Sequence, residues 1–96
     1  MAKLKYACIG AGGIARKKHV AGYAKQKDVE IVAICDTYEP SAAKLAADFG
    51  VEKYYTDYVK MLEECQPDIV SVCTPNCTHA EITIACLRAG AQVHVE

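Results

Sequence analysis

The chain has 96 residues and a mass of 10.4 kDa, with 12 acidic and 11 basic side chains, and 52% of its residues are hydrophobic. This size and balance fit one globular domain with a modest core and argue against a disordered chain. A net charge of −1 is unlike the strong basic balance of nucleic-acid-binding proteins. No apolar run approaches the roughly 18 residues of a membrane-spanning helix. The first residues also lack the apolar core of a secretory signal, so we expect a cytoplasmic protein with neither nucleic acid nor membrane as a partner.

Five short strand-like segments alternate with helical segments along the chain. Continuous runs rich in Val and Ile are typical of strands that are buried on both faces of a parallel sheet. The predicted strands span residues 5–9, 31–35, 53–55, 68–73 and 92–95. The predicted helices span residues 13–24, 40–49, 58–64 and 79–89. This order predicts an α/β fold, a doubly wound parallel sheet of the Rossmann type with right-handed crossovers.

Local signals mark the ends of the third and fourth predicted helices. Asp57 is placed to cap the third helix. Thr78 and Glu81 have the T-x-x-E spacing of a capping box, so we expect the fourth helix to begin after Thr78. Gly90 stands where a glycine commonly ends a helix.

Charges and cysteines are both unusual in this sequence. Residues 1–27 carry seven basic and no acidic side chains, which either helps to attract a phosphate-bearing ligand or is an ordinary solvated helix face.

The six cysteines lack the paired spacing of a zinc set, so we predict no metal site. Because Cys8, Cys35 and Cys73 lie in apolar runs, we expect them to be reduced core residues.

A glycine-rich turn connects the first strand to the first helix. Residues 10–15 read Gly-Ala-Gly-Gly-Ile-Ala, which is the pattern G-x-G-x-x-A. Gly10 allows a tight turn, Gly12 lets the backbone approach a pyrophosphate, and Ala15 permits close packing of helix on strand. The helix N-terminus then directs free N–H groups at the phosphates. The alternative is a glycine turn without a ligand.

Asp36 follows the second predicted strand. A carboxylate at this point accepts hydrogen bonds from the hydroxyls of an adenosine ribose and repels a 2′-phosphate. The next residues, Thr37 and Tyr38, supply no arginine for such a phosphate. The sequence therefore favours NAD over NADP, the alternative being that Asp36 serves only as a turn or capping residue.

A third polar segment, Thr74 to His79, follows the strand over 68–73. Ligands of doubly wound sheets lie beyond the carboxyl ends of the strands at the switch point, so we expect this loop opposite the glycine turn. Asn76 offers a donor and an acceptor, and His79 a titratable ring. Each also has a plain explanation, as a turn residue and a surface residue. His19 and His94 are weaker candidates for cofactor contact.

At these residues the sequence resembles the Gfo/Idh/MocA family of oxidoreductases, which includes glucose–fructose oxidoreductase, inositol dehydrogenase and the rhizopine catabolism protein MocA. The resemblance rests on residues 10–15, Asp36, residues 71–79 and residues 85–96. It covers nearly the whole chain, and the T-P-N-x-x-H loop is its most specific part. Cys86 replaces a small residue of the family pattern.

The resemblance implies an N-terminal Rossmann domain that binds NAD or NADP and a larger C-terminal α/β domain. It further implies hydride transfer at a hydroxyl or carbonyl group of a sugar, cyclitol or related substrate, and a homo-oligomer assembled through the second domain. The residues that it assigns to the cofactor are Gly10, Gly12, Gly13, Ile14, Asp36, Thr74, Pro75, Asn76, His79 and Glu96. In this assignment residues 10–14 hold the pyrophosphate and Asp36 the adenosine ribose. Residues 74–79 line the nicotinamide half, and Glu96 matches the glutamate of the family's E-K-P motif near the nicotinamide ribose.

The main departure from the family is that the chain ends at Glu96, one residue before the family's lysine. We therefore expect residues 1–96 to be a truncated Rossmann domain that binds cofactor without turning over substrate, and we assign no catalytic residue. The alternative functions are a non-catalytic nucleotide sensor and a different Rossmann enzyme, such as an S-adenosylmethionine-dependent methyltransferase. The T-P-N-x-x-H loop argues against the methyltransferase.

Overall fold

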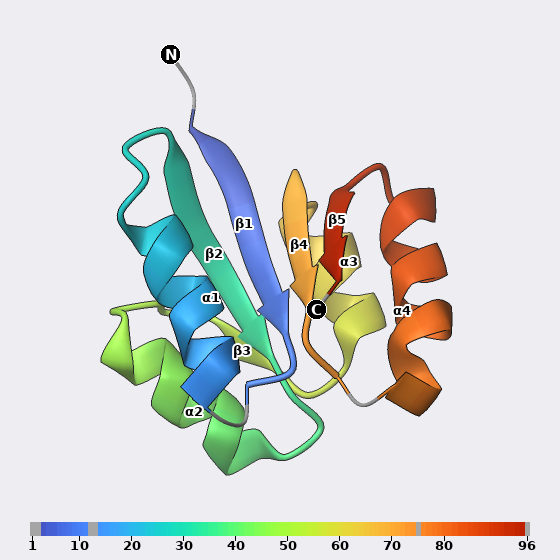
Figure 1. Cartoon of the computed structure of the whole chain (residues 1–96), viewed down its shortest axis with the longest axis horizontal. Helices are drawn as coiled ribbons and strands as arrows, with labels where there is room; N and C mark the ends of the chain where they lie inside the picture. The colour runs from blue at the N-terminus through green and yellow to red at the C-terminus, as the bar shows by residue number, and fades with distance from the viewer. Residues whose placement is uncertain (1–2, 12–13, 75, 96) are drawn as a thin grey trace.

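A five-stranded, all-parallel sheet forms the centre of the molecule (Figure 1). The computed structural model describes residues 3–11, 14–74 and 76–95, and the side chains of 14–17, 76–79 and 95 lie outside this description. The strands are β1 (Leu4–Ile9), β2 (Val29–Cys35), β3 (Tyr54–Tyr55), β4 (Ile69–Val72) and β5 (Gln92–Val95). Their order in the sheet is β3-β2-β1-β4-β5. The predicted doubly wound fold is therefore confirmed.

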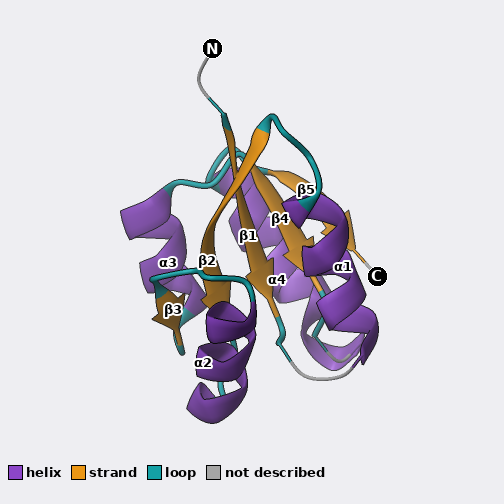
Figure 2. Ribbon diagram, turned by 90° about the vertical axis from the view of Figure 1, so that its left-hand side faces the viewer, coloured by secondary structure: helices purple, strands orange, loops and turns teal. Residues whose placement is uncertain are grey.

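In the described part of the chain, four helices cover the two faces of this sheet (Figure 2). They are α1 (Ile14–Ala24), α2 (Glu39–Asp48), α3 (Tyr58–Cys65) and α4 (Asn76–Arg88). Side chains alternate along β1: Tyr6 and Cys8 pack with α1 and α2, whereas Ala7 and Ile9 pack with α3 and α4. Since both faces are covered, the strands need continuous apolar runs, which is the pattern that predicted them.

Three of the local helix signals can be compared with the structure. The Asp57 side chain accepts a hydrogen bond from the Val59 N–H (2.9 Å), as expected of an N-cap. Gly90 follows α4 with φ +89°, also as expected. The predicted capping box is wrong, because α4 begins at Asn76 and Thr78 lies within the helix rather than before it. The sequence has a competing signal, a proline directly before Asn76, since proline is common at the beginning of a helix where an N–H would be left unpaired.

The cysteines with described side chains are buried: Cys8, Cys35, Cys65, Cys73 and Cys86. Burial raises the pKa of Cys35 to about 12 and that of Cys86 to about 11, so both thiols are protonated at neutral pH. The expectation of reduced core residues is confirmed for Cys8, Cys35 and Cys73. No helix in the described part of the chain combines the length and apolar character that a membrane span requires.

Candidate functional site

The carboxyl ends of β1, β2 and β4 lie side by side at one edge of the sheet (Figure 1). Gly10 follows β1, Asp36 follows β2, and Thr74 comes just after β4. The crossovers from β1 and from β4 cover opposite faces of the sheet, so this edge is the switch point where doubly wound folds bind ligands. Three segments that are distant in the sequence thus converge there.

Gly10 makes direct backbone contact with the loop after β4. Its φ is +100°, and a Cβ built on it would lie 2.7 Å from both the carbonyl carbon and the carbonyl oxygen of Cys73. Its N–H donates to the Cys35 carbonyl oxygen (2.7 Å), which ties the turn to the end of β2 as well. Only glycine fits this position, because any side chain would meet backbone atoms that cannot move aside.

The Asp36 carboxylate holds two backbone amides. The Ala11 N–H donates to Oδ2 (2.7 Å) and the Tyr38 N–H donates to Oδ1 (2.8 Å). The first bond fastens the glycine turn to the end of β2, and the second shapes the turn into α2. The two sequence interpretations of Asp36 are therefore compatible, since each oxygen has a further lone pair for a ligand hydroxyl. The sequence did not predict the hydrogen bond from Ala11 to Asp36, because no sequence pattern marks a contact between residues this far apart.

Thr74 contributes a buried polar atom without a partner. Its Oγ1 is fully buried and makes no hydrogen bond in the structure. A buried hydroxyl left unpaired costs about 1–3 kcal/mol. Such an atom beside the Gly10 turn is a donor and acceptor that a bound ligand can satisfy.

Two helix N-termini follow this edge directly. Ile14 is the first residue of α1 and Asn76 the first residue of α4, with His79 in the first turn of the latter. The side chains of these three residues lie outside the described part. Gly12, Gly13, Pro75 and Glu96 lie outside the described residues altogether. Free N–H groups and the positive ends of two helix dipoles favour an anionic ligand at this edge.

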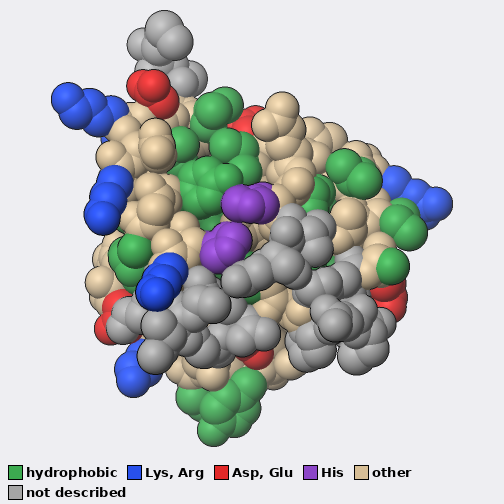
Figure 3. Space-filling model, viewed as in Figure 1, with side chains coloured by type: hydrophobic (Ala, Val, Ile, Leu, Met, Phe, Trp, Pro, Cys, Tyr) green, Lys and Arg blue, Asp and Glu red, His purple; other side chains and the backbone are tan. Residues whose placement is uncertain are grey.

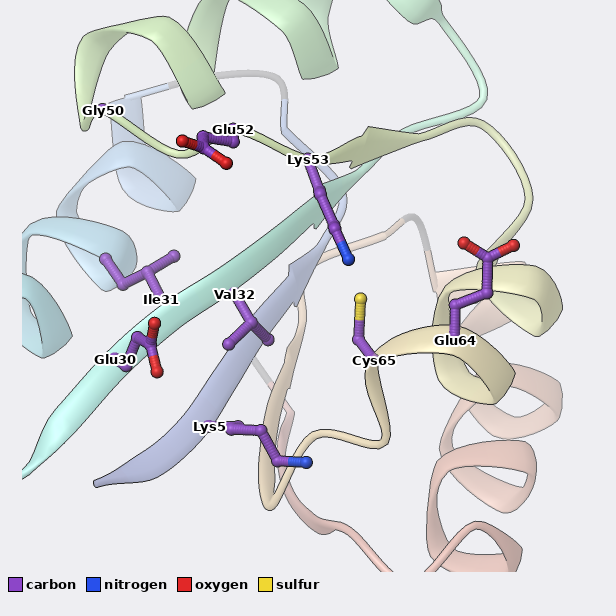
Figure 4. A pocket seen from close by; sticks show the side chains of 9 residues that line it. All are labelled: Lys5, Glu30, Ile31, Val32, Gly50, Glu52, Lys53, Glu64 and Cys65. Carbon is purple, nitrogen blue, oxygen red and sulfur yellow. The ribbon is translucent and has the colours of Figure 1, made fainter. Parts of the chain in front are cut away.

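A separate hollow of about 500 Å³ lies along the outer edge of β2 (Figure 4). It lies where β3 pairs with Ile34 and Cys35 alone among the described residues, so the earlier part of β2 is paired with β1 on one side and has no strand on its outer side. Glu30, Glu52 and Lys53 stand around it, and charged residues of this kind protect an open strand edge from pairing with other chains. None of the residues that line the hollow is Gly10, Asp36 or Thr74.

The fold and the site define a dinucleotide-binding Rossmann domain. Its features are a first strand, a glycine turn packed against the backbone after β4, a helix N-terminus and an acidic residue after the second strand. Comparison with protein families agrees. Residues 4–96 match the Gfo/Idh/MocA oxidoreductase family, NAD-binding Rossmann fold. The chain belongs to this family.

Several dehydrogenases are similar to the chain. D-glucoside 3-dehydrogenase of Escherichia coli is 42% identical over 93 residues, which is 97% of this chain and 26% of that protein. Myo-inositol 2-dehydrogenase of Thermotoga maritima is 36% identical over 69 residues, 72% of this chain and 21% of that protein. The crystal structure of a probable dehydrogenase from Thermotoga maritima superposes with a TM-score of 0.85 at 33% identity, covering 96% of this chain and 27% of that one. The chain thus spans about a quarter of the length of the curated relatives it matches.

Proposed function

We propose that the chain is the cofactor domain of an NAD-dependent oxidoreductase that transfers hydride between the nicotinamide and a hydroxyl or carbonyl group of a sugar or cyclitol. The proposal rests on the close approach of the Gly10 backbone to Cys73 and Thr74. Beside it, the Asp36 carboxylate accepts a hydrogen bond from the Ala11 N–H. Similar proteins named as glucoside and inositol dehydrogenases support the substrate class.

The groups at this edge fit a dinucleotide. The N–H groups of Gly10 and Ala11 already donate to Cys35 and Asp36, so those of residues 12–14 are proposed to bind the pyrophosphate. The basic segment 1–27 adds a favourable field. The unpaired Oγ1 of Thr74 suits a polar ligand atom. Pro75, Asn76 and His79 are proposed to complete the nicotinamide half, and Glu96 to lie near its ribose. When NAD is bound, it supplies the hydride chemistry, and the residues of this chain hold and orient it.

Asp36 supports a preference for NAD over NADP. Two N–H groups hold its carboxylate in place, so the carboxylate cannot turn away from a ligand without breaking a hydrogen bond. A 2′-phosphate would meet this negative charge at close range. The exposed side chains that follow, Thr37 and Tyr38, bring no compensating cation.

We propose that residues 1–96 bind cofactor and that a second domain provides the substrate site, because the chain spans only about a quarter of the length of the dehydrogenases it resembles. Assembly into a homo-oligomer and a cytoplasmic location stay predictions from the sequence. A hydride-transfer assay with polyols on this chain alone is expected to show no turnover.

The direct test is a fluorescence titration of the folded chain with NADH and, separately, with NADPH, after circular dichroism has shown native secondary structure. We expect saturable NADH binding that is tighter than NADPH binding. A folded chain that leaves NADH fluorescence unchanged contradicts the cofactor role. Equal affinities would contradict the role of Asp36 in the preference.

A further inference from the structure

An exposed tyrosine stands between Asp36 and the start of α2. Tyr38 is the most exposed large hydrophobic side chain in the described part of the chain, with an exposed fraction of 65%. Figure 3 shows hydrophobic side chains exposed at the lower end of the molecule, where Figure 1 places the start of α2. A single exposed apolar side chain is ordinary by itself. The place of this one, two residues after the carboxylate proposed to hold a ribose, gives it a ligand to meet.

Hydrogen bonds hold the backbone of Tyr38 on both sides. Its N–H donates to Asp36 Oδ1 (2.8 Å), and its carbonyl oxygen accepts from the N–H groups of Ser41 (3.1 Å) and Ala42 (3.4 Å). Tyr38 is the N-cap residue of α2, whose first turn contains Pro40 with its restricted φ. The ring therefore extends from a fixed point of the backbone, and little backbone freedom remains to be lost when a ligand binds.

The covalent structure of adenosine brings its base close to the atoms that Asp36 is proposed to hold. Adenine is bonded to C1′ of the ribose, and C1′ is the neighbour of the carbon that carries the 2′-hydroxyl. A ribose whose hydroxyl donates to the Asp36 carboxylate therefore has its base within one sugar ring of that carboxylate. Since the backbone nitrogen of Tyr38 lies 2.8 Å from Oδ1, the Tyr38 side chain begins beside the same ribose and is long enough to reach the base.

The groups around the ring favour an uncharged aromatic ligand. Asp36 precedes Tyr38 by two residues and the exposed Glu39 follows it, so carboxylates on both sides repel a phosphate. Adenine carries no charge at neutral pH. The stacking of a base on an aromatic side chain needs only an accessible ring face, which Tyr38 has, and it strengthens binding about tenfold or more.

We propose that Tyr38 stacks its ring on the adenine of the bound dinucleotide and so strengthens the binding of the adenosine half. The inference rests on the proposed cofactor role, and it adds a contact with the base to the contact of Asp36 with the ribose. Tyr38 is absent from the cofactor residues that the family resemblance assigns. Its hydroxyl takes no part in the stacking, so a phenylalanine at this position serves equally well.

The test is calorimetric titration of the 96-residue chain with ADP-ribose, which contains the adenosine half of NAD and lacks the nicotinamide. We expect Tyr38→Ala to weaken binding about tenfold, and Tyr38→Phe to bind within about twofold of the wild type. Leu87→Ala is the matched control. It removes another exposed apolar side chain, from α4 on the opposite face of the sheet, and should bind ADP-ribose like the wild type.

The stacking and the cofactor role fail in different ways. A folded wild type that binds neither NADH nor ADP-ribose overturns both. A wild type and a folded Tyr38→Ala that bind ADP-ribose equally overturn the stacking alone, and so does an equal loss in Tyr38→Ala and Leu87→Ala. Proton NMR of the saturated wild-type complex gives a check without variants: nuclear Overhauser effects are expected between the Tyr38 ring and the H2 or H8 proton of adenine. Their absence would also overturn the stacking.

Discussion

The edge with Gly10 and Asp36 and the face with His19 and His94 are two polar regions built in different ways. At the first, backbone groups make the site: a glycine packed on a carbonyl and two amides held by one carboxylate. At the second, side chains make it, each placed by a neighbouring hydroxyl. A site that is built from backbone groups is lost only when the fold itself changes. A site that is built from side chains can be removed by substitution while the fold persists.

The largest effect is expected from Gly10→Ala. The new Cβ would lie 2.7 Å from Cys73 backbone atoms, and φ +100° is unfavourable for alanine. We expect a loss of about 3 kcal/mol or more in the free energy of unfolding, together with loss of NADH binding. Urea denaturation and the NADH titration measure the two.

Gly22→Ala is the matched control for that variant. Gly22 lies in α1, where an added Cβ has no neighbour within 4 Å, so we expect stabilisation by about 0.5–1 kcal/mol. Equal free energies of unfolding for Gly10→Ala and Gly22→Ala would contradict the close packing of Gly10 against the loop after β4.

The second effect separates the structural role of Asp36 from its role in ligand binding. Asp36→Ala leaves the N–H groups of Ala11 and Tyr38 without their acceptor, so we expect a stability loss of about 1–2 kcal/mol. NADH affinity should fall about tenfold or more, with a smaller fall for NADPH.

Asp57→Ala is its control, since it removes a helix cap worth about 1 kcal/mol whose hydrogen bond goes to Val59 in α3. Its ratio of NADH to NADPH affinity should equal that of the wild type. A ratio that also stays unchanged in Asp36→Ala would show that the carboxylate does not face the ribose.

The smallest effect is expected from Thr74→Val. It removes the buried, unpaired Oγ1 while keeping the volume, so the free energy of unfolding should stay the same or rise by about 1 kcal/mol. NADH affinity should fall several-fold, about 1 kcal/mol, because a ligand partner is lost. A fall in stability would mean that the hydroxyl already has a partner in the free chain.

The sequence alone determined the order of strands and helices, the glycine turn and the acidic residue after β2. These signals are local: apolar runs, a glycine motif and capping residues such as Asp57 act on segments of a few residues. Even here the start of α4 was misplaced, because Thr78 and the proline before Asn76 are competing local signals and the proline position prevailed.

Tertiary structure decided the rest. Three contacts join residues that are distant in the sequence. They are the hydrogen bond from Ala11 to Asp36, the close approach of Gly10 to Cys73, and the contact of the His19 and His94 rings. They depend on which strands become neighbours and in what register, and that is set by the burial of both faces of the sheet rather than by any local pattern. The physical reason is that side chains project from elements whose positions exist only once the whole core has packed.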